Sequence, residues 1–145
     1  MKKVAALYDI HANLPALEAV LAEVDKRNVD GGVVGGDVIA GPLPIETLEL
    51  LTAAGEKRPF FYIHGNHESE MLRAAAGEPI DALSERAVEE ANWLASYLPV
   101  ELVTQIKTWP LTQQIAVDGV GDVLFCHATP KNDTYIFTEE TAEEQ

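Results

Sequence analysis

Four short polar segments of the sequence carry side chains that can bind divalent metal ions. Each lies where a β-strand is predicted to end, and they read Asp9-Ile10-His11, Gly36-Asp37, Gly65-Asn66-His67-Glu68 and Cys126-His127-Ala128. Together they offer two Asp, two His and one Asn, the oxygen and nitrogen donors that a pair of divalent ions needs, with His67 left over. Two ions about 3.5–4 Å apart stabilise the attacking and leaving oxygens of an in-line displacement, so the segments indicate phosphate-ester chemistry.

The spacing of these donors indicates how they divide between two ions. Asp9 and His11 are separated by one residue, so both side chains can leave a strand end toward the same side and bind one ion. Asp37 has two carboxylate oxygens and can bridge both ions. Asn66 offers a carbonyl oxygen and His127 an imidazole, and we expect this pair to bind the second ion.

The remaining two histidines have different expected roles. His67 follows Asn66 directly, so its side chain is predicted to point elsewhere and to protonate the departing oxygen as a general acid. His64 belongs to none of the donor sets, and we expect it at the rim of the site or in the core.

Each segment taken alone also has an ordinary structural explanation. Asp9 can cap the helix that follows it, and Gly36-Asp37 can be only a turn. Asn66 suits a left-handed or helix-capping position, and His127 suits the core. The occurrence of all four segments at predicted strand ends favours a joint site over four coincidences.

Composition limits the classes of function. The formal net charge of −14 argues against binding to polymeric nucleic acid, which needs clustered Lys and Arg. No apolar stretch approaches the roughly 20 residues that a membrane-spanning helix requires, so no membrane partner is expected. The single cysteine, Cys126, cannot form an intrachain disulfide, which fits a cytoplasmic location. A length of 145 residues predicts one domain over residues 1–145.

The predicted elements place the polar segments at one edge of a sheet. Strands are expected over residues 4–8, 31–36, 59–63, 113–117 and 122–126, the last two joined by a turn at Asp118-Gly119. Helices are expected after Asn13 and over residues 45–54, 68–76 and 81–98. The alternation of the first strands with helices predicts an α/β fold with a mostly parallel first sheet. Ligands of such sheets bind at the carboxyl ends of the strands.

The motifs resemble those of the calcineurin-like metallophosphoesterases, and most closely those of the small bacterial branch of that superfamily. The likeness covers essentially the whole chain and rests on Tyr8-Asp9-Ile10-His11-Ala12-Asn13, Gly36-Asp37 with Gly41-Pro42, Gly65-Asn66-His67-Glu68 and His127-Ala128-Thr129-Pro130. It implies a four-layer α/β/β/α sandwich that hydrolyses a small phosphomonoester, phosphodiester or nucleotide. It also implies two divalent ions, of Mn, Fe, Ni, Co or Zn. By this likeness, one ion is held by Asp9, His11 and Asp37, the other by Asp37, Asn66 and His127, and His67 is the catalytic histidine.

The chain departs from this family at two places near the predicted site. Ala40 and Gly41 stand where superfamily members that dephosphorylate proteins carry an Asp and an Arg. The Asp would orient His67 and the Arg would hold phosphate, so we do not expect a protein phosphatase. Asn13 and Glu68 are expected to orient the metal ligands.

A third departure lies toward the C-terminus. The family closes its site with a Gly-His-x-His motif, and no histidine follows His127 here. We therefore expect residues 1–145 to be the N-terminal part of a larger sandwich, with an incomplete second sheet whose exposed edge favours self-association.

Two alternatives to an active phosphoesterase follow from the sequence. One is a truncated remnant of such an enzyme that binds metal weakly and turns over little or no substrate. The other is a regulatory receiver-type α/β domain that binds one Mg²⁺ beside an acceptor Asp. A receiver domain would have no use for the four histidine and asparagine donors together, so it is the weaker alternative.

Overall fold

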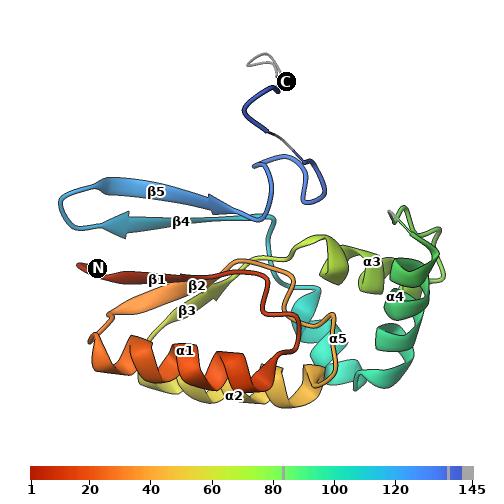
Figure 1. Ribbon diagram of the computed structural model, residues 1–145, viewed down its shortest axis with the longest axis horizontal. Helices are drawn as coiled ribbons and strands as arrows, with labels where there is room; N and C mark the ends of the chain where they lie inside the picture. The colour runs from red at the N-terminus through yellow and green to blue at the C-terminus, as the bar shows by residue number, and fades with distance from the viewer. Residues whose placement is uncertain (83, 137, 142–145) are drawn as a thin grey trace.

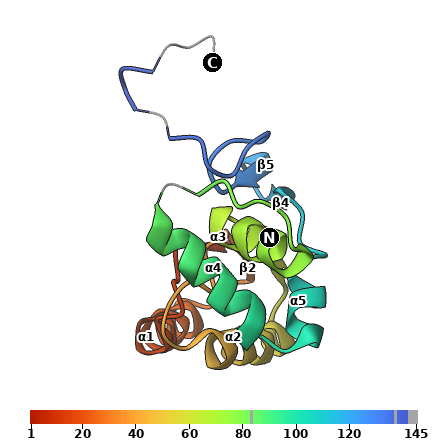
Figure 2. The same ribbon diagram turned by 90° about the vertical axis from the view of Figure 1, so that its right-hand side faces the viewer.

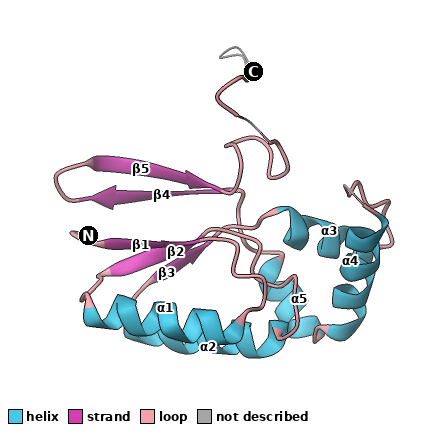
Figure 3. Cartoon of the chain, viewed as in Figure 1, coloured by secondary structure: helices cyan, strands magenta, loops and turns pink. Residues whose placement is uncertain are grey.

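The protein folds into three stacked layers, a pair of helices, a parallel sheet and a two-stranded antiparallel sheet (Figure 1). A computed structural model describes residues 1–82, 84–136 and 138–141. The α/β class and the mostly parallel first sheet predicted from the sequence are confirmed. In the described part of the chain, no helix covers the outer face of the antiparallel sheet (Figure 3).

The parallel sheet consists of β1 (Val4–Leu7), β2 (Gly31–Val34) and β3 (Phe60–Tyr62), in the order β1-β2-β3. The central strand β2 is buried at every residue, as expected for a strand covered on both faces and both edges. Leu7 pairs with Val34 and Val34 with Tyr62, so the three strands end side by side. The loops that follow them therefore meet at one edge of the sheet.

Two helices cover one face of this sheet, α1 (Leu14–Lys26) and α2 (Pro44–Lys57) (Figures 1 and 3). Asn13 caps α1 by accepting a hydrogen bond from the backbone N–H of Ala16 at 3.2 Å. The second helix was predicted to end at residue 54, but α2 continues through Gly55 to Lys57. A glycine in the last turn weakens a helix by only about 1 kcal/mol, which the packing of Leu48 and Leu51 offsets.

The other face is covered by a hairpin of β4 (Thr112–Val117) and β5 (Gly121–Cys126). The predicted turn is confirmed, and Gly119 adopts a φ of +81° within it. Ile115 of β4 packs between the sheets against the buried side chains of Val33 and Ile63.

Three more helices lie at the end of the parallel sheet, α3 (Asn66–Ala76), α4 (Glu85–Tyr97) and α5 (Val100–Ile106) (Figure 2). Helix α3 begins two residues earlier than predicted, which places Asn66 and His67 in its first turn. Helix α4 begins four residues later than predicted, because Ser84 caps it, and α5 was not predicted. None of the helices formed by the described residues has the length and hydrophobicity that a membrane crossing requires.

Candidate metal centre

The loops after β1 and β2 bind each other through their backbones and carry three of the predicted metal ligands. His11 donates its backbone N–H to the carbonyl of Asp37 at 2.9 Å, and Asp9 donates its own to the carbonyl of Gly36 at 3.3 Å. Asp9, His11 and Asp37 all have left-handed backbone conformations, with φ near +50°. Non-glycine residues rarely adopt this conformation, and when they do it commonly marks a functional site.

Two glycines allow the loops after β2 and β3 to approach closely. A Cβ atom on Gly36 would lie 2.4 Å from the backbone nitrogen of Gly65, and a Cβ on Gly65 would lie 2.3 Å from Oδ1 of Asp37. Neither position can hold a side chain without moving backbone or a carboxylate. The pair thus fixes how near Asp37 comes to the start of α3.

Two imidazole rings are oriented by backbone carbonyls. Nδ1 of His11 lies 3.1 Å from the carbonyl oxygen of Ala40, and Nδ1 of His127 lies 2.8 Å from that of Gly35. A carbonyl oxygen only accepts hydrogen bonds, so in each contact Nδ1 carries the proton. Both rings therefore present Nε2 to the site with a free lone pair when neutral, the arrangement that a metal-binding histidine needs.

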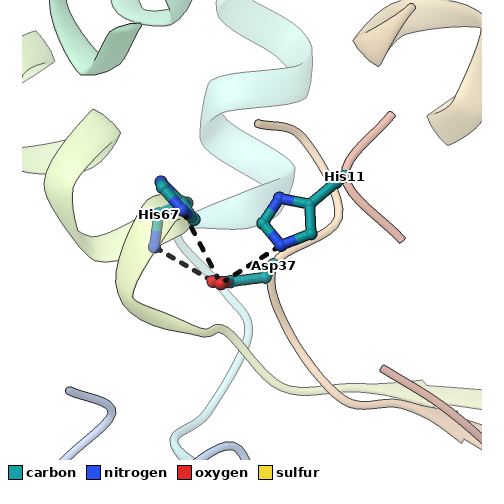
Figure 4. Close-up of side chains that lie close together, drawn as sticks. All are labelled: His11, Asp37 and His67. Atoms are coloured by element: carbon teal, nitrogen blue, oxygen red, sulfur yellow. Dashed lines mark hydrogen bonds and ion pairs between the residues drawn. The ribbon is translucent and has the colours of Figure 1, made fainter. Parts of the chain in front are cut away.

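The imidazole rings of His11 and His67 face the side chain of Asp37 (Figure 4). Its Oδ2 atom lies 3.9 Å from Nε2 of His11, 3.8 Å from Nε2 of His67 and 3.5 Å from Nε2 of His127. The Asp37 side chain is only 6% exposed, whereas that of Asp9 is 61% exposed and lies 3.7 Å from Nε2 of His11. Asp37 thus lies at the buried side of the site, and Asp9 lies at its solvent-exposed side.

The first turn of α3 brings the remaining predicted residues to the same place. The backbone N–H of His67 donates to Oδ1 of Asp37 at 3.1 Å. The side chain of Asn66 donates from Nδ2 to Glu70 at 3.4 Å, which leaves its carbonyl oxygen available as a ligand. Asn66 also lines a cavity of about 320 Å³ with Asp9, His127 and residues 128 and 133–136.

The described side chains form two groups of three donors, and the groups share Asp37. One contains Asp9, Asp37 and His127, and the other contains His11, Asp37 and His67, with the donor atoms of each within 4.8 Å of one another. This grouping differs from the one expected from the sequence, which pairs Asp9 with His11 and leaves His67 outside the metal ligands. The geometry therefore permits two ways of dividing the donors between two ions. Four of the residues singled out from the sequence, Asp9, His11, His67 and His127, place donor atoms within 4.8 Å of the Asp37 carboxylate. Asn66 lines the same cavity as Asp9 and His127.

The contact between Asp37 and His127 favours the charged form of both side chains. Burial alone would raise the pKa of Asp37, but contacts with His127 and His67 outweigh it and hold the pKa below its usual range. The Asp37 carboxylate in turn raises the pKa of His127 to about 9. Without a metal ion, the pair is therefore a buried carboxylate and an imidazolium at neutral pH, and a bound cation would replace the imidazolium charge.

Glu68 joins the loop after β2 to the loop after β3 through hydrogen bonds. The sequence predicts that this residue orients metal ligands. Its fully buried carboxylate accepts backbone N–H bonds from Asp37 and Gly65 at Oε2 and from Val38 and Ile39 at Oε1, over 2.8–3.3 Å. Asn13, also expected to orient ligands, caps α1, as its place before a predicted helix indicates. Burial and the Asp37 charge raise the pKa of Glu68.

Sequence reasoning missed two features of the site. Glu70 lies beside His67 and Asn66, and its position three residues after His67 on a predicted helix was a usable signal. His64 and Ser69 both contact Asp133, which brings the segment after β5 over the start of α3. No sequence pattern indicates the contact of Asp133 with Ser69, because it joins an irregular loop to a helix. The side chain of His64, expected at the rim of the site or in the core, is 18% exposed.

The donor set fits divalent ions of the first transition row, since it combines carboxylate, amide and correctly oriented imidazole groups. An ion held by one such group of three would have further coordination positions for water or substrate, as catalytic metal sites require.

Comparisons with known proteins relate the whole chain to one family. The family model described as calcineurin-like phosphoesterase matches residues 2–144. An uncharacterized protein of Methanocaldococcus jannaschii is 28% identical over 130 residues, which cover 89% of this chain and 50% of that protein. The crystal structure of a metallophosphoesterase from Sphaerobacter thermophilus is similar, with a TM-score of 0.55 and 29% identity over 77% of this chain and 43% of the other. The chain thus spans about half the length of the relatives it matches.

Proposed function

Because this chain belongs to the calcineurin-like phosphoesterase family, we propose that it hydrolyses a phosphate ester bond with two divalent ions bound around Asp37. The observation that carries the proposal is the convergence of two donor groups on a single buried carboxylate. Asp37 can offer one oxygen to each ion, so it can hold the two at the short separation that phosphoryl transfer needs.

The proposed ligands are those indicated by the sequence. Asp9, His11 and Asp37 hold one ion, and Asp37, Asn66 and His127 hold the other. The contacts of His11 and His127 with backbone carbonyls support this assignment, because they fix Nε2 as the metal-binding atom. Mn, Fe, Ni, Co and Zn all suit such ligands.

We propose His67 as the catalytic residue. Its Nε2 atom faces Asp37 at 3.8 Å, at the centre of the site. When bound, the ions supply positive charge that stabilises the attacking and leaving oxygens. His67 donates a proton from Nε2 to the leaving oxygen, which otherwise departs as an alkoxide.

The proposed substrate is a small phosphomonoester, phosphodiester or nucleotide. The cavity beside the site has a volume of about 320 Å³, which suits a small molecule. Ala40 is 5% exposed and contributes its backbone carbonyl to His11, so this position offers no phosphate-binding side chain. Protein phosphatase activity is therefore not proposed.

Hydrolysis of bis(p-nitrophenyl) phosphate with added Mn²⁺ tests the proposed function. We expect turnover that EDTA abolishes, and about 100-fold or greater losses in Asp37→Ala and His67→Ala. Metal content measured by mass spectrometry should fall in Asp37→Ala and stay near two ions per chain in His67→Ala.

Asp122→Asn is the matched control, because it removes one exposed carboxylate from β5, away from the site. Its activity and metal content should equal those of the unmodified chain. Activity that survives Asp37→Ala would belong to a contaminant and would contradict the proposal. Stoichiometric binding of one Mg²⁺ without hydrolysis would favour a receiver-type domain instead.

A second candidate function is ion binding with little turnover. The exposed fractions of Asp9 and His11, 61% and 42%, favour it, because water competes strongly for an open site. Metal content well below two ions per chain, with no measurable hydrolysis of aryl or alkyl phosphates, would support this candidate over the first.

A further inference from the structure

One buried carboxylate in the first two turns of α3 has no role in the mechanism above. Glu70 is 5% exposed, and its Oε2 atom has no hydrogen-bond partner among the described residues. Burying a carboxylate without partners is costly, so the position requires an explanation. Oε2 faces the imidazole of His67, whose Nδ1 lies 3.5 Å away.

The two oxygens of Glu70 face two residues of the site. Oε1 accepts a hydrogen bond from Nδ2 of Asn66 at 3.4 Å, while Oε2 faces His67. Both contacts follow from helix geometry, because residues three and four apart lie on one face of α3. A single carboxylate thus contacts the proposed general acid and a proposed metal ligand.

We propose that Glu70 is a positioning residue, which holds His67 with a proton on Nδ1 and its Nε2 atom directed at the leaving oxygen. This inference rests on the proposed function, in which the imidazolium form of His67 donates its Nε2 proton to the leaving oxygen, and the neutral ring that remains keeps the Nδ1 proton facing Glu70. Among the described acidic side chains, only Asp37 and Glu70 form ion-pair contacts with His67.

The two carboxylates act on opposite nitrogens of the same ring. Asp37 faces Nε2 at 3.8 Å and Glu70 faces Nδ1 at 3.5 Å, so they compete for the single proton of the neutral imidazole. Metal ions would engage Asp37 and leave Glu70 as the acceptor for Nδ1–H. Glu70 then orients the ring through its Nδ1–H.

Glu70 simultaneously fixes the amide of Asn66. A carboxylate only accepts hydrogen bonds, so it selects the rotamer of Asn66 in which Nδ2 points to Glu70 and the carbonyl oxygen points away. The Glu70 carboxylate therefore orients both the proposed proton donor, His67, and the proposed neutral metal ligand, Asn66.

The first test is the tautomer of His67, measured by ¹⁵N NMR on the metal-free chain at a pH where His67 is neutral. Glu70→Gln keeps the size of the side chain but places an amide NH₂ or a weaker acceptor at Nδ1. We expect the fraction of the Nδ1–H tautomer to fall at His67 and to stay unchanged in Glu89→Gln, an exposed glutamate of α4. An unchanged tautomer in Glu70→Gln would overturn the proposal.

The second test compares two phosphodiesters that differ in leaving group. Bis(p-nitrophenyl) phosphate releases nitrophenolate, and dimethyl phosphate releases an alkoxide. A poor alkoxide leaving group depends on the general acid, whereas nitrophenolate does not. The loss in Glu70→Gln should therefore be about tenfold larger with alkyl than with aryl leaving groups. Equal losses with both would indicate a structural role and would overturn the proposal.

A double-mutant cycle separates this role from general damage to the site. In a His67→Ala background, Glu70→Gln should leave the ratio of alkyl to aryl rates unchanged, because the group it positions is gone. A further tenfold change in that ratio would contradict the proposal. If the unmodified chain shows no hydrolysis, the proposed function fails, and the NMR comparison still decides whether Glu70 sets the His67 tautomer.

Discussion

Nε2 of His127 lies 3.5 Å from Oδ2 of Asp37, although one residue follows β5 of the hairpin and the other follows β2 of the parallel sheet. This contact joins the two sheets at their common edge. The carboxylate is 6% exposed and the imidazole 10%, so the pair is shielded from solvent. Its charge state therefore affects both metal binding and the stability of the metal-free chain.

The stability of the metal-free chain should fall between about pH 6.5 and pH 9. The pKa of His127 is raised from 6.5 to about 9 in the folded chain, first by its contact with Asp37. The folded state therefore binds a proton that the unfolded state has released, and the stabilisation disappears as the pH rises through about 9. Thermal unfolding in EDTA across this range should show a declining melting temperature.

His127→Gln should flatten this decline, because the variant has no imidazole to titrate. His64→Gln is the matched control, since it changes the same residue type at the rim of the site, and it should keep the decline. A melting temperature that rises from pH 6.5 to 9 in the unmodified chain would contradict the assignment.

Sequence patterns predicted the position of this site well because parallel strands impose it. Strands that run side by side end at one edge, so Asp9 and Asp37 had to lie near each other once β1 and β2 were recognised. His127 follows the hairpin, and its arrival at the same edge was supported by the family resemblance. The metal and catalytic roles of these residues stay predictions, as do a cytoplasmic location and self-association.

Other features depend on contacts that no local pattern encodes. Helix α3 begins at Asn66 because Glu68 accepts the backbone N–H of Gly65 at 2.8 Å, so the capping group is three residues inside the helix. The left-handed conformations of Asp9 and His11 are held by backbone bonds to the loop after β2. Such bonds exist only after the sheet has formed, and propensity alone favours other conformations there.

Gly36→Ala should unfold or severely destabilise the chain and abolish metal binding. The new Cβ would lie 2.4 Å from the backbone nitrogen of Gly65, and φ at this position is +93°. Gly119→Ala is the matched control, because its φ is +81° but nothing lies within 4 Å of the added Cβ. We expect losses of about 1 kcal/mol for the control and more than about 2 kcal/mol for Gly36→Ala, measured by urea unfolding. Equal losses would show that the close approach to Gly65 is unimportant.

Glu68→Gln should cost about 3 kcal/mol or more of folding stability, although the two side chains have the same shape. Each carboxylate oxygen accepts two backbone N–H groups, and the amide NH₂ of glutamine would face one of these pairs as a donor. Glu89→Gln, an exposed change of the same chemistry, should lie within about 0.5 kcal/mol of the unmodified chain. Chemical denaturation of both variants measures their free energies of unfolding. Similar values for the two would refute the role given to Glu68.

The segment after β5 should detach from α3 when Asp133 loses its charge. Asp133 accepts a hydrogen bond from Ser69 and lies 3.6 Å from Nδ1 of His64, and these contacts, the one with His64 first, lower its pKa. The segment lines the cavity beside the metal centre through residues 133–136. Asp133→Asn should therefore accelerate amide hydrogen exchange at residues 128–136 by about tenfold and leave the exchange of α3 unchanged.

Asp122→Asn is the control for this loop, because Asp122 is an exposed carboxylate of β5 that precedes the segment. Its exchange pattern should match that of the unmodified chain. Because the cavity wall includes the loop, Asp133→Asn should also raise KM for a small phosphodiester more than it lowers kcat. Slow exchange at residues 128–136 in Asp133→Asn would show that other contacts hold the segment over the metal centre, and KM should then stay unchanged as well.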